Sequence, residues 1–455
     1  MTDDVTALRG KVSGLMGQAK KDLAQLVSFK SVADPRQFPP EGCAQTAQWV
    51  ADAFAAAGLT EVGLHETPDG SSAVIASKPG PPGTPTVLLY CHYDVQPPLD
   101  DAAWKTPVWT LTDKDGRWYG RGAADCKGNI VAHLTALRAI GPDFPIGIKV
   151  VAEGSEEQGT GGLEKFVVAN PALLRSDAIL VADCGNFAVG VPTFTQTLRG
   201  MVNVVLTVKT LEGPMHSGMF GGPAPDALAA MIQLLSSLRD AEGNTTIDGL
   251  TDDQKWAGVQ YPSADFRSDA GVLDGVDLLG NGTVSDMLWA RPALTVLGMD
   301  VPAVVGSSAA IQPSTRARLN LRIPPGTEPK QAYDLLEKHL RAHVPWNAEL
   351  DIEVEALGEP FVASTQGPAR SAMEKAMATS YGRDVTTEGQ GGSIPLCNVF
   401  ADTYPEAEIM LIGVEEPKCL IHAPNESVDP SEIEHMALAE ALFLTSYRTA
   451  SEGGR

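Results

Sequence analysis

Short apolar runs alternate with helical patterns in the first and last parts of the chain. The segment 127–140 has a helical pattern, because Ile130, Leu134, Leu137 and Ile140 recur every three or four residues. Four apolar runs, each typical of a buried strand, are Val87–Cys91, Ile148–Ala152, Ala178–Ala182 and Ile409–Val414. This alternation of strand and helix predicts an α/β fold with a mostly parallel sheet and helices on both faces.

The pattern changes between residues 197 and 363. Strict alternation of apolar and polar positions predicts one-sided antiparallel strands at 201–209, 316–325 and 349–357. Helical patterns near 226–238 and 329–343 complete an α+β unit, and the Gly- and Asp-rich stretch 243–285 is expected to be mainly loop. We therefore expect an α/β domain, residues 1–196 and 364–455, that is interrupted by a smaller inserted α+β domain, residues 197–363.

Composition restricts the class of protein. The chain has 43% apolar and 20% charged residues, which is typical of a folded globular protein. Asp and Glu number 57 against 34 Lys and Arg, so the formal net charge is -23. This charge repels nucleic acid phosphates and anionic membranes, so neither is expected as a partner.

The compartment is predicted from the N-terminal segment and the cysteines. The N-terminus begins acidic and lacks the basic start and apolar segment of a signal peptide. No apolar run reaches the roughly 18 residues that a membrane span needs. The six cysteines are dispersed and form no C-x-x-C pair, which favours reduced thiols. We expect a cytoplasmic protein.

Potential metal ligands follow each of the four apolar runs. The carboxyl ends of parallel strands collect at one edge of a sheet, so these side chains are expected to meet there. With one further acid before the helix at 127–140, they are His92, Asp94, Asp125, Glu156, Glu157, Asp183 and His422. Each signal alone is weak, because Glu-Glu pairs usually lie on solvated faces. Together, two imidazoles and several carboxylates predict a site for a pair of divalent metal ions.

The arrangement of motifs resembles a family of co-catalytic zinc metallopeptidases. This family includes carnosinase-type dipeptidases, N-acyl amino acid deacylases, succinyl-diaminopimelate desuccinylase and glutamate carboxypeptidases. The resemblance covers essentially the whole chain and is greatest to the cytosolic carnosinase-like dipeptidases. The motifs that carry it are "HYDVQP", "GRGAADCKG", "EGSEEQGTGG", "HSGMFGG", "GQGGSIP" and "IHAPNE".

The resemblance implies which residues hold the two metal ions. His92, Asp125 and Asp183 would bind one ion, and Asp125, Glu157 and His422 the other, so that Asp125 bridges them. Zinc is the expected metal, with manganese or cobalt as alternatives. The resemblance also implies a cis peptide bond between Asp125 and Cys126.

The resemblance likewise implies the roles of the acids beside these ligands. Asp94 would accept a hydrogen bond from the imidazole of His92 and fix its tautomer. Two cations a few ångströms apart lower the pKa of a bridging water, and Glu156 would act as the general base that transfers its proton to the departing amine. Adjacent residues in extended chain point apart, so Glu157 can bind metal while Glu156 faces substrate.

Substrate contacts are implied mainly for the inserted domain, which would serve as a lid and dimerisation domain. His216 would stabilise the oxyanion of a partner subunit in a homodimer, and Arg322 would bind the substrate carboxylate. Gly392 and Ser393 would line the substrate site. The remaining histidines are expected not to bind metal, and Cys91, Cys126 and Cys184 are expected to pack in the core.

A dipeptidase is the leading functional hypothesis. Asp183, where relatives can have Glu, resembles the enzymes that act on peptides with free amino termini. The alternative within the family is an N-acyl amino acid amidohydrolase, which would share every ligand. A non-catalytic metal-binding protein is disfavoured because Glu156 is present, and a serine hydrolase because no G-x-S-x-G motif occurs.

Overall fold

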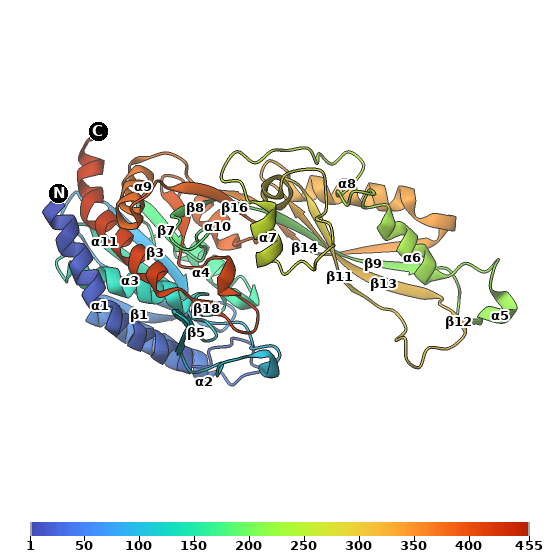
Figure 1. Ribbon diagram of the computed structural model, residues 1–455, viewed down its shortest axis with the longest axis horizontal. Helices are drawn as coiled ribbons and strands as arrows, with labels where there is room; N and C mark the ends of the chain where they lie inside the picture. The colour runs from blue at the N-terminus through green and yellow to red at the C-terminus, as the bar shows by residue number, and fades with distance from the viewer. Residues whose placement is uncertain (1, 454–455) are drawn as a thin grey trace. The chain divides into compact units, whose positions relative to one another are not determined.

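The chain forms two compact units in the computed structural model, which describes residues 2–453 (Figure 1). Of the described residues, the first unit comprises 2–196, 363–388 and 395–453, and the second comprises Thr197–Val362 with Gly389–Ile394. The two sheets differ in kind, as the pattern of the sequence predicts. Among the described helices, none is both long enough and apolar enough to cross a membrane.

The first unit is built on a sheet whose centre is parallel. The strand order is β1 (Glu61–Glu66), β2 (Ser72–Lys78), β6 (Gly147–Glu153), β3 (Thr86–His92), β7 (Ala178–Ala182), β17 (Glu408–Ile412) and β8 (Thr193–Leu198). Strands β6, β3, β7 and β17 are parallel neighbours, whereas β1, β2 and β8 pair antiparallel. The predicted α/β fold with a mostly parallel sheet is therefore confirmed.

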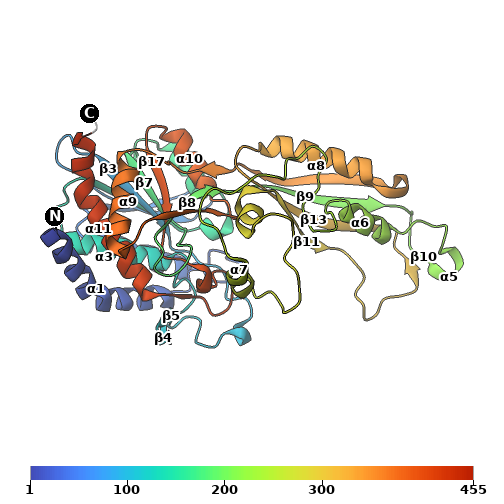
Figure 2. The ribbon, with the colours of Figure 1, turned by 45° about the horizontal axis from the view of Figure 1, so that its top comes forward.

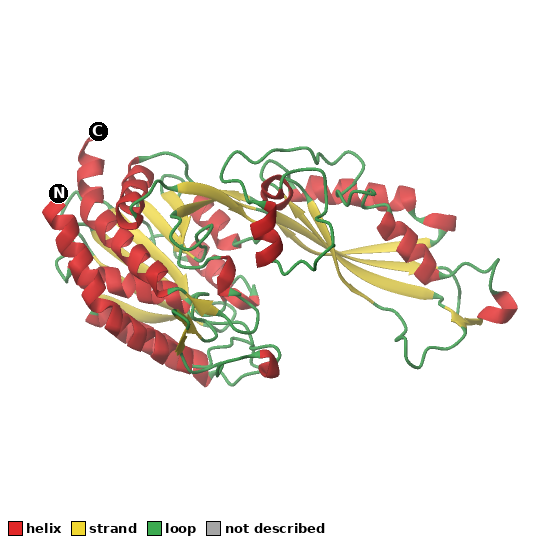
Figure 3. Ribbon diagram, in the orientation of Figure 1, coloured by secondary structure: helices red, strands yellow, loops and turns green. Residues whose placement is uncertain are grey.

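Helices cover both faces of this sheet (Figures 2 and 3). One face carries α1 (Thr2–Ser28), α2 (Glu41–Ala56), α3 (Lys127–Ile140), α9 (Pro368–Tyr381) and α11 (Pro430–Gly453). The other face carries α4 (Gly162–Ala169) and α10 (Pro395–Thr403). Alternation along β3 shows the division, because Leu89 packs in the cluster around α3 whereas Tyr90 contacts Phe400 of α10.

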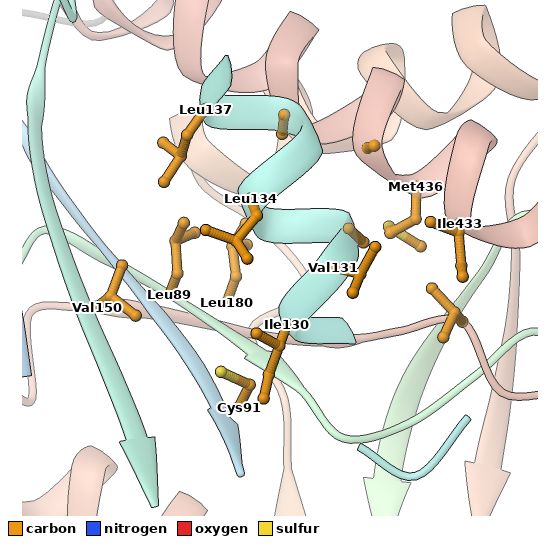
Figure 4. Close-up of a cluster of buried hydrophobic side chains, with 14 of the residues drawn as sticks. Leu89, Cys91, Ile130, Val131, Leu134, Leu137, Val150, Leu180, Ile433 and Met436 are labelled. Carbon is orange, nitrogen blue, oxygen red and sulfur yellow. The ribbon is translucent and has the colours of Figure 1, made fainter. Parts of the chain in front are cut away.

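The core between α3 and the sheet is largely apolar (Figure 4). Ile130, Leu134 and Leu137 of α3 are 0% exposed and face the sheet, as their helical spacing predicts. Cys91 lies in the same cluster and is also 0% exposed. It therefore packs as a small apolar side chain. This rigid layer fixes the end of β3, where the polar site begins.

The second unit is an antiparallel sheet covered by helices. Its strand order is β11 (Ala293–Met299), β13 (Ser314–Ile323), β9 (Gly200–Lys209) and β14 (Glu349–Gly358). Leu319, Leu321 and Ile323 of β13 are buried in its core with α6 (Ala227–Ser236) and α8 (Pro329–His343). The predicted alternation is confirmed for β13, whereas in β14 a register shift between Val354 and Ala356 interrupts it and leaves Val354 and Leu357 exposed.

Smaller elements complete the chain. They are β4 (Thr112–Lys114), β5 (Arg117–Tyr119), β10 (Met215–His216), α5 (Ser217–Phe220), α7 (Ser263–Asp269), β12 (Ala310–Ile311), β15 (Phe361–Val362), β16 (Thr386–Gln390) and β18 (Ser427–Val428). Helix α7 lies in the stretch 243–285, which the sequence predicts to be mainly loop, and none of its residues is buried.

Candidate metal centre

Four parallel strands end at one edge of the first sheet, and each delivers a polar residue there. His92 is the last residue of β3, and Asp183 directly follows β7. Strand β6 leads into the short 3-10 turn Glu156–Gln158. Beyond β17 the chain runs to His422, which adopts a positive φ of 61°. The strands are buried and apolar, so the polar side chains begin only where each strand leaves the core.

The structure brings together all five residues for which the resemblance implies metal binding. The Nε2 atom of His92 lies 2.9 Å from Asp125 Oδ1 and 3.0 Å from Asp183 Oδ1. The Nε2 atom of His422 lies 3.0 Å from Asp125 Oδ2 and 3.1 Å from Glu157 Oε2. Asp125 thus shares its two oxygens between two imidazoles, which divides the five residues into two groups around one carboxylate.

The carboxylates of this cluster raise the pKa of a neighbouring imidazole. Burial lowers the pKa of His422, but hydrogen bonds to Asp125 and Glu157 outweigh it and raise that pKa to about 11. Burial also raises the pKa of Glu157 to about 6. Oxygen and imidazole donors in this number fit two divalent metal ions of the borderline class.

Asp94 has a different main contact from the one expected. Its two carboxylate oxygens accept the backbone N–H groups of Glu156 and Glu157, both at 3.1 Å. The Nδ1 atom of His92 is 3.1 Å from the backbone oxygen of Asp94 and 3.4 Å from its carboxylate. The residue still contacts the imidazole, but its side chain mainly fixes the backbone of the two glutamates.

The two glutamates have different surroundings. Gln96 donates to Glu157 from its backbone N–H, at 3.2 Å, and from its side chain, at 2.8 Å. Within residues 2–453, no hydrogen bond engages the carboxylate of Glu156. Burial, followed by the charge of Asp183, raises the pKa of Glu156 well above its usual value. Hydrogen bonds thus fix the carboxylate of Glu157, whereas among the described residues none fixes that of Glu156.

Two further acids fix the backbone of the site, and sequence analysis missed both. Asp69 accepts from the hydroxyl groups of Ser155, at 2.7 Å, and Thr160, which flank the Glu156–Gln158 turn. Glu426 accepts from the backbone N–H groups of Gly122, Ala124 and Asp125 at 3.0, 3.1 and 3.2 Å. The motif "IHAPNE" ends in Glu426 and offered a signal, whereas Asp69 lies in an ordinary turn.

The peptide bond between Asp125 and Cys126 is cis, as the resemblance implies. Cys126 also comes close enough to His92 and Asp183 to be considered as a ligand. Its Sγ, however, donates to the backbone oxygen of Ala182 at 3.0 Å, and burial raises its pKa to about 12. A thiol in this state is a poor ligand, because metals bind the thiolate.

Glu415 is a third acid that the sequence analysis did not select. It follows β17 and lies near Asp125 and Asp183, within the distance that a shared ion would allow. Its Oε1 accepts from the side chain of Asn129 at 2.6 Å. Glu415 could have been selected because it follows an apolar strand, but the neighbouring Glu416 has the same position, so the sequence does not distinguish the two.

The other predicted site residues belong to the second unit. His216 is exposed, and its Nδ1 accepts the N–H of Gly218 at 3.1 Å. Arg322 is half-buried in β13, and Gly392 is exposed beside the half-buried Ser393.

A second group of possible ligands lies in the same unit, where His339 and His343 of α8 approach Asp248. The Nδ1 of His339 accepts the N–H of Asp248 at 3.1 Å, and the Nδ1 of His343 lies 2.8 Å from the backbone oxygen of His339. These nitrogens already serve the fold, so the group does not favour a metal site.

Replacement of Asp94 by Ala should release the turn that carries both glutamates. Two N–H groups would lose their acceptor, at a cost of about 1–3 kcal/mol each in the free energy of unfolding. Hydrogen exchange of the peptide containing Glu156 and Glu157 should become faster. Asp100→Ala is the control, because Asp100 accepts one N–H, that of Ala102, at 3.0 Å in an exposed turn. Unchanged exchange at the two glutamates in Asp94→Ala would contradict this assignment.

Comparison with known proteins agrees with this geometry. The chain is 43% identical over 437 residues to the cysteinylglycine-S-conjugate dipeptidase of Corynebacterium striatum, covering 94% of this chain and 95% of that protein. It is 29% identical over 415 residues to the Beta-Ala-His dipeptidase of Rattus norvegicus, covering 84% and 82%. The crystal structure of human carnosine dipeptidase 1 has the same fold, with a TM-score of 0.82 at 22% identity over 97% of this chain and 98% of that one. The profile of peptidase family M20/M25/M40 matches residues 88–446, and the chain belongs to this family.

Proposed function

We propose that the protein is a metal-dependent dipeptidase whose first unit holds two divalent metal ions. His92, Asp125 and Asp183 would hold one ion, and Asp125, Glu157 and His422 the other. The observation that carries the proposal is the position of Asp125, whose two oxygens each face a different imidazole. The relative at 43% identity is named a dipeptidase, which supports the substrate class.

Different groups in the site would carry out different steps of hydrolysis. When bound, the two ions would supply an acidified water and polarise the scissile carbonyl. Glu156 takes a proton from the attacking water and returns it to the departing amine. Burial raises the pKa of Glu156, so this carboxylate takes up a proton more readily than an exposed one. Asp94 holds the backbone on which Glu156 sits.

We propose zinc as the native metal. Two imidazoles and three carboxylates suit zinc, and manganese and cobalt accept the same donors. The residues proposed to contact the substrate are Arg322 for the α-carboxylate, Gly392 and Ser393 for the wall of the site, and His216 of the partner subunit for the oxyanion. The protein would then be a cytoplasmic homodimer that pairs through its second unit.

An N-acyl amino acid amidohydrolase is not favoured. The relatives named above are called dipeptidases, for Cys-Gly conjugates in one case and for β-Ala-His in the other. The free amino terminus of the substrate is therefore the feature that separates the two functions.

A substrate panel tests the proposal directly. Protein treated with a chelator should be inactive, and Zn²⁺ or Mn²⁺ should restore hydrolysis of dipeptides such as Cys-Gly and β-Ala-His. The same peptides with acetylated amino termini should be poor substrates. Faster turnover of N-acyl amino acids than of dipeptides would overturn the proposal in favour of the amidohydrolase.

Substitution of the two adjacent glutamates should have different effects. Glu156→Gln removes only the proton acceptor, so kcat should fall by about 10²–10⁴-fold while two metal ions stay bound. Glu157→Gln removes a ligand, so the metal content should fall as well. Metal analysis and kinetics of both variants distinguish the roles. Loss of metal in Glu156→Gln to the same degree as in Glu157→Gln would show that the roles are wrongly assigned.

Complementation tests the proposed role of His216. Glu156→Gln and His216→Ala homodimers should each be nearly inactive. A mixed dimer has one complete site, with Glu156 from one chain and His216 from the other, so random re-pairing should regain about one site in four. Mixed dimers that are verified by mass spectrometry but recover no activity would rule out action between subunits.

A further inference from the structure

Two arginines of the second unit lie near each other at one end of its sheet. Arg199 immediately precedes β9, and Arg322 is the penultimate residue of β13. In the ladder between these strands Arg322 is opposite Met201, two residues after Arg199. Long side chains at such offsets can reach each other. Burial, and then the positive charge of Arg322, lower the pKa of Arg199 to about 10.

Both guanidinium groups have hydrogen-bond donors without acceptors. Arg199 is 7% exposed, and its Nε and Nη1 atoms are buried with no hydrogen-bond partner. The Nη1 atom of Arg322 is in the same state. Within the described part of the chain, neither arginine forms an ion pair with a carboxylate. Buried donors on a charged group are costly to leave unpaired, so this pair is poised for an anion that the chain itself does not provide.

Another arginine of the same unit shows that this arrangement is unusual. Arg291 is 5% exposed, yet its Nε donates to the backbone oxygen of Gln254 at 3.1 Å and its Nη1 to Asn281 at 2.7 Å. The fold therefore can satisfy a buried guanidinium with its own acceptors. At Arg199 the fold provides no acceptor for the Nε and Nη1 donors.

The segment Gly389–Ile394 lies against Arg199. The backbone N–H of Arg199 donates to the oxygen of Gln390 at 3.2 Å. A Cβ atom on Gly391 would lie 2.7 Å from Nη2 of Arg199, so the backbone of this segment passes close to the guanidinium. Beside it, Gly392 has no atom within 4 Å of its Cβ position, which leaves space at this side of the pair.

We propose that Arg199 and Arg322 together bind one carboxylate group, the α-carboxylate of a peptide substrate, with Arg199 as a second specificity-determining residue. This inference rests on the proposed dipeptidase function. A carboxylate can accept about four hydrogen bonds, enough to engage two guanidinium forks. Two adjacent cations also create a local positive field that attracts the substrate carboxylate, within a chain whose net charge is -23.

Kinetics on free and amidated dipeptides test the proposal. Arg199→Met should lower kcat/KM for the free acid by about 10- to 100-fold, the loss expected for hydrogen bonds between charged groups. The amidated peptide should change much less, so the ratio of the two rates should shrink. Arg199→Lys retains the charge without the fork and should give an intermediate ratio. Arg291→Met is the matched control and should leave the ratio unchanged.

A binding measurement separates this inference from the proposed function. Glycine, but not glycinamide, should raise the melting temperature of the wild-type protein, and Arg199→Met should abolish the difference. If glycine and glycinamide differ in this way but the wild-type protein hydrolyses no dipeptide, the carboxylate site is supported and the proposed dipeptidase function is overturned. Conversely, dipeptide hydrolysis with an equal loss on acid and amide in Arg199→Met would overturn the role of Arg199 alone. If Arg199→Met fails to fold, an unchanged acid-to-amide ratio in Arg199→Lys would have the same meaning.

Discussion

The sharing of one carboxylate between two imidazoles is the interaction on which the metal centre depends. Asp125 Oδ1 faces His92 and Asp125 Oδ2 faces His422, at 2.9 and 3.0 Å. This geometry requires a fixed backbone at Asp125. Glu426 provides it by accepting the backbone N–H groups of Gly122, Ala124 and Asp125, and α3 begins soon afterwards at Lys127. The buried ammonium of Lys127 in turn donates to the backbone oxygens of Leu26 and Phe29 at 2.9 and 3.0 Å, so α1 also supports the bridge.

Acids that fix a neighbouring backbone also support the second half of the centre. Acids that do not themselves point at the cluster fix the backbone of those that do, as Asp69 and Asp94 do for the Glu156–Gln158 turn. Many carboxylates close together repel one another, and burial strengthens this repulsion. The cluster persists because hydrogen bonds fix the backbone at Asp125, Glu156 and Glu157, next to strands that pack in a rigid core.

Much of this organisation could be predicted from the sequence, because it is periodic or ordered along the chain. Helices α3 and α8 begin and end where their apolar spacing predicts. The candidate ligands other than Asp125 could be collected because each comes after an apolar strand, and Asp125 because it precedes a helical pattern. Helix α7 could not be predicted, since it is seven residues long and has no buried face to produce a pattern. The residues that contact Asp69, Asp94 and Arg199 could not be predicted either, because a contact between distant segments of the chain does not affect the local spacing of residue types.

The connection of the second unit to the sheet of the first has its own consequence. The outgoing residues Thr197 and Leu198 pair with the returning residues Val362 and Phe361. Next to them, a side chain on Gly200 would collide with the backbone of Gly358 and with Pro360. The two ends of the stretch 197–362 thus run side by side, as two tightly apposed strands. A change of length between these ends leaves the register of β3, β6 and β7 unchanged, because these strands pair only with strands outside that stretch.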